Sequence, residues 1–313
     1  MTDEPPADAA LIEAIEALAV EIAREAGVEV EHALKREISV DYKPDAKGKP
    51  AEVDPVSEVD HAVEALVRTR LAERFPGHAI VGEEVVTPPP ADAEWLWVVD
   101  PVDGTANFVN GFPLFAVSIG VLHLGRPVVG AVWCATTHAL HPGVYHAHEG
   151  GPLRLDGEVV VSDRPTKVKR RLAAVPGGSS AGTKGWDHRV TGSMAIEAAY
   201  VAAGVFTCVP FWGPRLWDIA GGVVLVRAAG REAWIRIDGA WQPLERFEAP
   251  TTRPQRRQKR RGAAPTDDGP LTLRDWRASV IIGTTEGCEA LRARPVRVPW
   301  WRRAGRLLRG RRR

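Results

Sequence analysis

A strand-like apolar run that ends in two acidic residues is the stretch of this sequence best suited to chemistry. Trp95 to Val99 favours a buried strand, and Asp100 and Asp103 follow it, three positions apart. Gly104 and Thr105 come next, where the pattern can turn helical. Carboxylate oxygens are preferred ligands of hard divalent cations, and free N–H groups at the start of a helix bind phosphate. The stretch therefore predicts a cation site beside a phosphate site.

Three further acidic residues stand at the ends of predicted elements. Glu83 follows a short strand and a glycine, Asp60 falls in the first turn of a helix, and Asp218 opens another helix. Carboxylates gathered without Lys or Arg repel one another and raise their own pKa values, which a bound divalent cation prevents. A set made only of oxygen ligands favours Mg²⁺ or a similar hard ion over zinc.

The elements that must position these residues fall into two groups. Before about residue 165 we expect two amphipathic helices, one over 8–27 and one from an N-cap at Ser57 to about residue 75. The same part is expected to hold an antiparallel sheet, with strands over residues 78–81, 95–99, 116–122, 127–133, 144–148 and 153–161.

A composition change over residues 162–169 predicts a junction, after which strands and helices alternate. Strands are predicted over residues 173–175, 206–211, 232–237 and 279–283. Helices are predicted over residues 193–203, 216–229 and 286–292. The chain thus divides into a first domain over 1–165, a second over 166–292 and a basic tail over 293–313.

Composition and cysteine content narrow the class of protein. The chain has 313 residues and is 44% hydrophobic, enough for a large core, and it has no apolar run of the ~18 residues that a membrane span needs. Its acidic beginning lacks a charged-then-apolar leader, so we expect no secretory signal. Three widely spaced cysteines argue against a disulfide framework or a zinc cluster and fit a cytoplasmic location.

Charge is unevenly spread along the chain. Residues 1–100 hold 23 acidic and 9 basic side chains, a balance of −14, whereas residues 251–313 hold 18 basic and 5 acidic ones, a balance of +13. Residues 249–270 are predicted to be a disordered basic insertion. The Arg-rich tail has several interpretations: an amphipathic helix on an anionic membrane, a nonspecific contact to nucleic acid, a disordered solubilising tail, or a segment that folds against acidic surface of this chain or a partner subunit.

The motifs together resemble those of the inositol monophosphatase family of Mg²⁺-dependent, lithium-sensitive phosphatases, over about residues 8–292. The resemblance rests on Gly82-Glu83-Glu84, on Asp100-Pro101-Val102-Asp103-Gly104-Thr105, and on Trp217-Asp218-Ile219-Ala220-Gly221. As a combined signature in the right order, these three motifs are far more specific than any one of them.

The resemblance implies roles for individual residues. It implies two or three Mg²⁺ ions, held by Glu83, Asp100, Asp103, Asp218 and the main-chain carbonyl of Val102. It implies contacts to the phosphate and the rest of the substrate from Asp103, Gly104, Thr105, Gly192, Ser193 and Asp218. It also implies that the hydroxyl of Thr105 pairs with Asp60 and that, with Glu83, they orient the attacking water.

Two positions depart from the inositol branch of that family. The glutamate seven residues before the aspartate of the Trp-Asp pair is Phe211 here, and the aspartate eleven residues before it is Thr207. A hydroxyl-rich ring loses a partner at Phe211, which leaves the phosphate ester unidentified. A lysine from the polar segment over 41–52, predicted to be a mobile loop, is expected near the metals; the candidates are Lys43, Lys47 and Lys49.

Other polar residues have simpler interpretations. Four clustered histidines are expected to be exposed on a hairpin, with a zinc or nickel site as the less favoured alternative: His138, His141, His146 and His148. Cys134 and Cys208 lie in apolar strands and are expected to be core thiols.

The resemblance implies an αβαβα sandwich of the sugar-phosphatase type with the active site between its two domains. The predicted activity is Mg²⁺-dependent hydrolysis of a small polyol or sugar phosphate, by default inositol monophosphate, by in-line attack of water. Alternative substrates are fructose 1,6-bisphosphate, a 3′-phosphoadenosine nucleotide and histidinol phosphate. A homodimer is implied. The alternative of another class is a catalytically weak member that binds membrane or nucleic acid through its basic tail.

Overall fold

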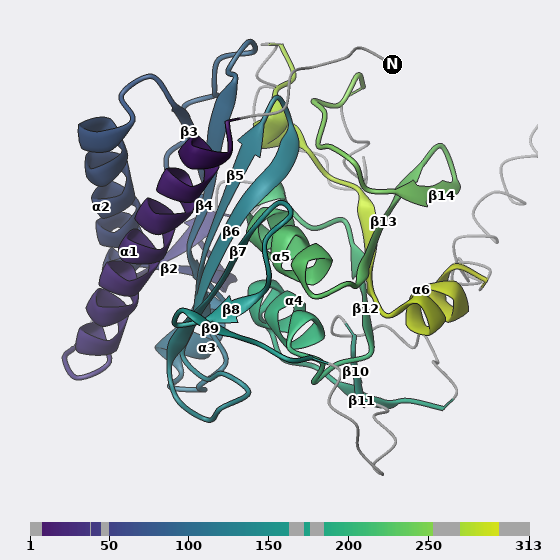
Figure 1. Cartoon of the computed structure of the whole chain (residues 1–313). Coiled ribbons are helices and arrows are strands. Elements are labelled where there is room, and N and C mark those ends of the chain that lie inside the picture. Colours follow the sequence, from purple (N-terminus) through teal and green to yellow (C-terminus); the bar gives the residue numbers. More distant parts are fainter. Residues whose placement is uncertain are drawn as a thin grey trace, which may run out of the picture.

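Helices and strands alternate in layers in the computed structural model, which describes residues 8–37, 39–44, 50–162, 172–175, 185–252 and 270–293. Two helices cover one face of a large sheet, two more lie between this sheet and a small sheet, and one helix covers the outer face of the small sheet (Figure 1). This arrangement confirms the predicted αβαβα sandwich.

The outer helical layer consists of α1 (Ala9–Ala33) and α2 (Glu58–Arg74). Both show the three- and four-residue apolar spacing that buries one face of a helix, and α1 continues six residues beyond its predicted end. Ser57 caps α2 as predicted: its side chain accepts from the backbone of Asp60, and the Asp60 carboxylate accepts from the backbone of Ser57. This reciprocal cap fixes Asp60 in the first turn of α2.

The large sheet has seven strands in the order β3-β4-β5-β6-β7-β8-β9. Their bounds are β3 Ala79–Gly82, β4 Trp95–Asp103, β5 Ala116–His123, β6 Arg126–Cys134, β7 Gly143–His148, β8 Arg154–Leu155 and β9 Glu158–Val159. The predicted antiparallel pairing is confirmed except at the edge, where β3 runs parallel to β4. The strand predicted over 153–161 is instead the short hairpin β8–β9, because the chain turns at Asp156, with φ +51°, and Gly157.

The inner helices are α4 (Met194–Ala202) and α5 (Leu216–Ala228). α5 is apolar nearly all round because sheets lie on both of its sides. Its Gly221 touches the large sheet through backbone: a Cβ there would lie 2.7 Å from the Ile119 carbonyl oxygen, and one on Gly120 would lie 2.6 Å from the Gly221 nitrogen. This close approach brings the start of α5 to the sheet.

The small sheet has four antiparallel strands in the order β12-β15-β13-β14. Its strands are β12 Cys208–Trp212, β15 Ser279–Gly283, β13 Glu232–Ile237 and β14 Ala240–Pro243. A separate parallel pair, β10 (Leu172–Ala174) and β11 (Asp187–Arg189), lies beside β12, and α6 (Thr285–Arg292) covers the small sheet. The 3₁₀ turn η1 (Leu273–Asp275) leads into β15. One apolar core includes side chains from both sheets and from α4 and α5.

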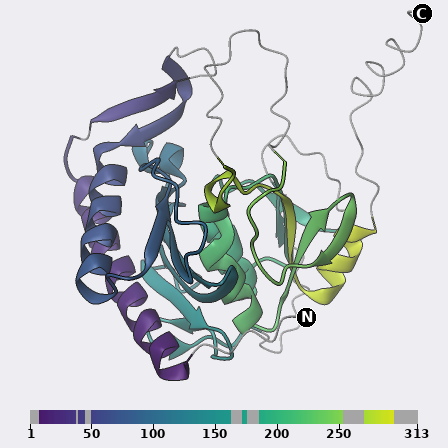
Figure 2. The same cartoon turned by 90° about the horizontal axis from the view of Figure 1, so that it is seen from above.

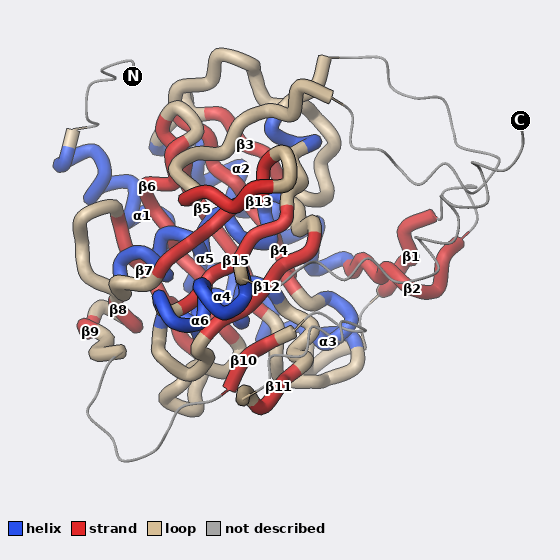
Figure 3. Tube along the Cα trace, turned by 90° about the vertical axis from the view of Figure 1, so that its right-hand side faces the viewer, coloured by secondary structure: helices blue, strands red, loops and turns tan. Residues whose placement is uncertain are grey.

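In the segment predicted as a mobile loop over 41–52, the described residues, 41–44 and 50–52, belong to two paired strands. Strands β1 (Val40–Pro44) and β2 (Pro50–Ser57) pair antiparallel and stand away from the body of the molecule (Figures 2 and 3). The loop prediction was wrong here because backbone pairing needs no apolar side chains, so a polar stretch with prolines and a glycine did not reveal it. Lys43 lies in β1, whereas Lys47 and Lys49 lie outside the described residues.

Several predicted segments fall wholly or mostly outside the described residues. They are the junction at 162–169 with the boundary at 165/166, the insertion over 249–270 beyond Thr252, and the tail from residue 294. The two-domain division therefore stays a prediction. Within the described ranges, every helix is too short or too polar to cross a bilayer.

Candidate functional site

A bulge at the end of β4 places the two motif aspartates on one face of the large sheet. Asp100 pairs with Ser118 and Asp103 with Ala116, so three steps along β4 oppose two steps along β5. In a regular strand, residues three apart point to opposite faces, and one extra residue restores the same face. Pro101 lies inside this bulge, where its missing N–H costs the ladder no bond.

Gly104 turns the chain from β4 into the short helix α3 (Thr105–Val109). It has φ +89°, and a Cβ there would lie 3.2 Å from both the Leu114 carbonyl oxygen and the Ser193 Cβ. Glycine meets both requirements at once. The Thr105 hydroxyl lies 2.9 Å from the carbonyl oxygen of Val102 and 3.4 Å from Asp60 Oδ1. Thr105 and Asp60 are therefore neighbours, as the resemblance implied.

Asp103 is fixed by the start of α4. Its Oδ2 accepts from the Ser193 hydroxyl and from the backbone N–H of Ala195, each at 2.6 Å. Ser193 is also the N-cap of α4 and only 2% exposed. In the structure, Ser193 therefore binds the Asp103 carboxylate. The contacts to substrate expected of Ser193 and of Gly192, whose φ is +81°, stay predictions.

Asp218 reaches the same region from α5. It is the third residue of that helix, and its Oδ2 accepts from the backbone N–H of Arg215 at 2.6 Å. Glu83 lies in the partly exposed loop after β3, and its own N–H donates to the Val99 carbonyl oxygen at 3.2 Å. The end of β3 and the start of α5 thus bring Glu83 and Asp218, more than 130 positions apart in the chain, to the same region.

Mutual repulsion among these carboxylates shows how close they lie. Burial raises the pKa of Asp100 well above its usual range, and the charges of the other four acidic residues raise it further. Burial raises the pKa of Asp103 to about 6, against the hydrogen bonds from Ser193 and α4. Burial and then Asp103 raise the pKa of Asp218 to about 7. The five predicted acids therefore converge, as the resemblance implied.

A buried oxygen in this cluster suits a cation. Asp100 is 2% exposed, and its Oδ1 accepts no hydrogen bond within the described part of the chain. Across those described residues no three His, Cys, Asp or Glu side chains already form a ligand set. Asp103 and Asp218 each direct one oxygen to a protein donor. An unsatisfied carboxylate oxygen among like charges is an arrangement that a hard divalent ion stabilises.

Sequence reasoning missed a buried network behind Asp103. Thr191 donates from its hydroxyl to Glu197 Oε1 at 2.7 Å and accepts from the backbone of Ser193 at 3.2 Å. Burial raises the pKa of Glu197, on α4, to about 7. Asn107 ties α3 to this segment, since its side chain donates to the carbonyl oxygens of Leu114 and Thr191. The capping pattern around Ser193 was the available signal, because Glu197 falls in the first turn of the helix that Ser193 begins.

Phe211 is the main departure from the inositol branch, and it is a core residue. It lies in β12, is 1% exposed and belongs to the core shared by both sheets. The next residue, Trp212, is 42% exposed.

The histidine cluster is partly buried. His146 is 8% exposed and its Nδ1 lies 2.7 Å from Glu16 Oε1 on α1, so the expectation of an exposed histidine was wrong here. The sequence pattern of β7 did not show that α1 covers that face. His138 pairs instead with the Tyr145 hydroxyl at 2.6 Å.

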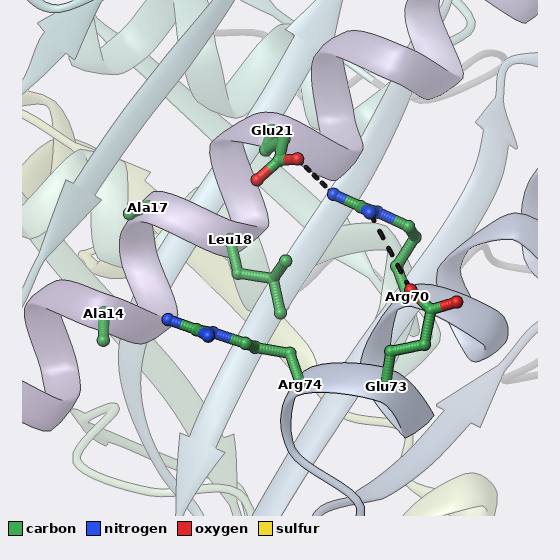
Figure 4. Close-up of a pocket in the computed structure, with 7 residues that line it drawn as sticks. All are labelled: Ala14, Ala17, Leu18, Glu21, Arg70, Glu73 and Arg74. Carbon is green, nitrogen blue, oxygen red and sulfur yellow. Dashed lines mark hydrogen bonds and ion pairs between the residues drawn. The ribbon is translucent and has the colours of Figure 1, made fainter.

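A groove of about 350 Å³ between α1 and α2 is a separate feature (Figure 4). It is lined by Ala14, Ala17, Leu18, Glu21, Arg70, Glu73 and Arg74. Arg70 pairs there with Glu21, Glu25 and Glu73, contacts that lie partly in solvent and contribute little each. Arg70 is ten residues along α2 from Asp60, about 15 Å at the helical rise, so the groove lies away from the carboxylate cluster.

The sequence matches the inositol monophosphatase family over residues 11–246. The chain belongs to the inositol monophosphatase family. It is 32% identical to inositol monophosphatase 2 of Solanum lycopersicum over 235 residues, which cover 68% of this chain and 84% of the relative. It is also 32% identical to a probable inositol 1-monophosphatase of Mycobacterium tuberculosis, covering 66% of this chain and 81% of that one.

Other relatives and solved structures agree in fold. The Nus factor SuhB of Salmonella typhimurium is 35% identical over 187 residues, covering 56% of this chain and 70% of that protein. The SuhB structure from Bartonella henselae has a TM-score of 0.65 at 21% identity, and it covers 90% of this chain and 99% of that one. An IMPase/NADP phosphatase structure with Mg²⁺ and phosphate has a TM-score of 0.66 at 19% identity, and it covers 90% of this chain and 94% of that one. Family membership makes this chain a phosphoric monoester hydrolase.

Proposed function

We propose that this protein hydrolyses the phosphate monoester of a small polyol or sugar with Mg²⁺, and that inositol monophosphate is the default substrate. The observation that carries the proposal is the buried, unsatisfied Oδ1 of Asp100 among four other carboxylates, next to the turn at Gly104. Relatives support the same cofactor and substrate class: one neighbouring structure holds Mg²⁺ and phosphate, and another holds D-inositol-1-phosphate.

Five groups of this chain would hold two or three Mg²⁺ ions: the carboxylates of Glu83, Asp100, Asp103 and Asp218 and the carbonyl of Val102. The bound metal supplies positive charge that lowers the pKa of the attacking water and stabilises the leaving oxygen. In both Asp103 and Asp218 the hydrogen bonds from α4 or from the Arg215 N–H hold Oδ2, so Oδ1 is the oxygen that would face the metal.

The residues around Thr105 would orient the reacting groups. Backbone N–H groups of Gly104 and Thr105 bind the phosphate oxygens, as the family resemblance implies. The Thr105 hydroxyl, held between the Val102 carbonyl and Asp60 Oδ1, faces the water together with Glu83. Ser57 holds Asp60 Oδ2 at 2.6 and 2.7 Å, which leaves Oδ1 to accept a hydrogen bond from the Thr105 hydroxyl while that hydroxyl orients the water.

Fewer observations bear on which alcohol the phosphate ester carries. Phe211 lies in the core, so its position offers no polar contact to a hydroxyl-rich ring. The substrate alternatives therefore remain fructose 1,6-bisphosphate, a 3′-phosphoadenosine nucleotide and histidinol phosphate. A related structure with 2′-AMP bound supports including nucleotides. The homodimer also remains part of the proposal.

A phosphate-release assay over these four substrate types, with Mg²⁺ and Li⁺ varied, tests the function. We expect Mg²⁺-dependent turnover of at least one substrate and inhibition by Li⁺, which also soaks into a related staphylococcal enzyme as an inhibitor. No Mg²⁺-dependent turnover on any of the four would overturn the proposal. Equal binding of full-length and 1–292 protein to anionic vesicles and to DNA would remove the alternative role for the basic tail.

A further inference from the structure

The loop that carries Glu83 has its N–H groups bound from one side by a buried glutamate. Glu64, on α2, is fully buried and accepts from the backbone N–H groups of Glu84 at 2.8 Å and Val85 at 3.2 Å. Arg68 donates twice to the same Glu64 carboxylate, at 2.6 and 3.0 Å, and so compensates its charge. A Cβ on Gly82 would lie 2.4 Å from Glu64 Cδ, so glycine is needed for this close contact.

The carbonyl groups of the same loop are bound from the other side by Arg274. One guanidinium nitrogen donates to the Gly82 carbonyl oxygen and the other to the Glu83 carbonyl oxygen, the second at 2.9 Å. Together with the Glu83 N–H bond to Val99, these contacts bind the carbonyls of Gly82 and Glu83 and the N–H groups of Glu83, Glu84 and Val85. A planar fork of donors suits two adjacent carbonyls, which a lysine cannot match.

Arg274 also contacts the element that supplies the opposite ligand. Its guanidinium lies over the ring of Trp217, 5.2 Å from the centroid, and Trp217 immediately precedes Asp218. The turn that carries Arg274 is fixed locally, because Thr272 caps it through the Arg274 N–H at 3.2 Å and Asp275 bonds back to the Thr272 N–H at 3.1 Å. One side chain thus joins the loop of Glu83 to the start of α5.

We propose that Arg274 is a positioning residue that holds Glu83 in place relative to Asp218, and so sets how tightly the site binds its divalent cation. The inference rests on the proposed function, in which Glu83 and Asp218 are ligands. Its physical basis is pre-organisation, because a ligand loop held by hydrogen bonds to its carbonyl and N–H groups loses less freedom when the cation arrives. Without Arg274, two half-buried carbonyls lose their donors and the loop can move away from Asp218.

The charge of Arg274 and its positioning role should have opposite effects on Mg²⁺ affinity. Removing a cation near the carboxylates makes the cluster more negative, which by charge alone favours Mg²⁺ binding. If Arg274 positions the Glu83 loop, its removal should instead weaken Mg²⁺ binding. The sign of the change therefore separates the two effects.

The test compares Arg274→Met, Arg274→Lys and a matched control, Arg236→Met. Arg236 makes the same two kinds of contact far from the cluster: its Nε donates to the Gly239 carbonyl oxygen at 3.0 Å, and its guanidinium lies over the Trp241 ring at 5.8 Å. For each full-length variant, Mg²⁺ binding is measured by calorimetry, the Mg²⁺ dependence of phosphate release is measured by assay, and the melting temperature is measured without metal.

We expect Arg274→Met to raise the Mg²⁺ dissociation constant about 10- to 100-fold, the range typical of groups that orient metal ligands, while Arg236→Met leaves it unchanged. Arg274→Lys should recover little of that loss, because it keeps the charge without the fork. An unchanged Mg²⁺ constant in Arg274→Met, even with a lowered melting temperature, would overturn the proposal and leave a purely structural role. Full recovery in Arg274→Lys would also overturn it, because a single ammonium donor would then suffice and the fork across two carbonyls would not be what positions the loop.

Failure of the inference differs from failure of the proposed function. If the wild-type protein binds Mg²⁺ but releases no phosphate, the function fails, and the effect of Arg274→Met on binding still decides the positioning role. If wild type is active and Arg274→Met binds Mg²⁺ as tightly as Arg236→Met and wild type do, the function stands and the positioning role fails. A wild type that binds no Mg²⁺ at all overturns both.

Discussion

Two segments with similar strand-to-helix form contribute very differently to the site. The segment from β4 to α3 delivers Asp100, Asp103 and Thr105 from one fully buried strand and one bulge. The segment from β12 to α5 delivers Asp218 alone, and Phe211 on its strand lies in the core. The comparison indicates that most of the groups proposed for cation and phosphate come from the β4 segment, whereas the β12 strand, which departs from the inositol branch at Phe211, contributes none of them.

Asp100→Asn should give the largest effect, because it alters the β4 segment at its most buried acid. We expect phosphate release to fall by about 10³-fold or more, as when one charge-stabilising group is lost from an active site. Stability without metal should rise or stay level, since a buried charge among like charges is removed. Activity and thermal unfolding measured in parallel check this, and undiminished activity would exclude Asp100 from the site.

Phe211→Glu tests whether the β12 segment can regain the polar group of the inositol branch. Because Phe211 is 1% exposed, the change buries a carboxylate in the apolar core, and we expect a loss of about 3–5 kcal/mol of unfolding free energy. Trp212→Ala, at the exposed neighbour, should cost about 1 kcal/mol or less.

Denaturant unfolding of both β12 variants, with turnover of inositol monophosphate, provides the measurement. If Phe211→Glu were as stable as wild type and turned over inositol monophosphate faster, the segment would be able to face the site, and the contrast between the two regions would disappear.

Gly221→Ala tests whether the close backbone contact between α5 and the large sheet is needed to place Asp218 beside the β4 acids. A Cβ would lie 2.7 Å from the Ile119 carbonyl oxygen, so α5 must shift, and we expect a cost of about 1–3 kcal/mol and weaker Mg²⁺ binding through displaced Asp218. Gly77→Ala is the control, since a Cβ there meets nothing within 4 Å. Equal stability of the two variants would show that the glycine contact is not needed.

Glu197→Gln should have an effect on stability that depends on pH. The pKa of Glu197 is raised from 4.5 to about 7, so the folded state binds its proton more tightly than the unfolded state. Its contribution to stability is therefore greatest below pH 4.5 and is lost as pH rises from 4.5 to 7, by up to about 3 kcal/mol.

Replacing Glu197 with the neutral, isosteric glutamine should remove that part of the slope, so the difference in unfolding free energy between variant and wild type should grow from pH 5 to pH 7. Parallel pH profiles would contradict the raised pKa.

Local patterns predicted much of the fold and the identity of the acids. The cap at Ser57, the buried strand before Asp100 and the hairpin over 116–133 depend on neighbouring residues, and each was confirmed. The sequence predicted that Asp218 would meet Asp100 and Asp103, and the structure brings these three acids together.

Contacts between distant segments were beyond the sequence patterns. The burial of His146 depends on α1, the orientation of Phe211 depends on the packing of β12 against β15 and α4, and the link from Arg274 to Glu83 spans 191 positions. The bulge in β4 could have been predicted from the sequence, because a proline inside a strand, here Pro101, indicates a break in the hydrogen-bond ladder. Hairpin β1–β2 was missed because its pairing is carried by backbone.

A crystal soaked in Mn²⁺, with anomalous difference density collected, tests most directly whether carboxylates of the large sheet and α5 form one cation site. We predict a peak within about 2.3 Å of Asp100 Oδ1 and of an Asp218 carboxylate oxygen, and no such peak in Asp218→Asn crystals. A peak elsewhere, or Asp100 Oδ1 still without a partner in fully soaked wild-type crystals, would contradict the proposed site.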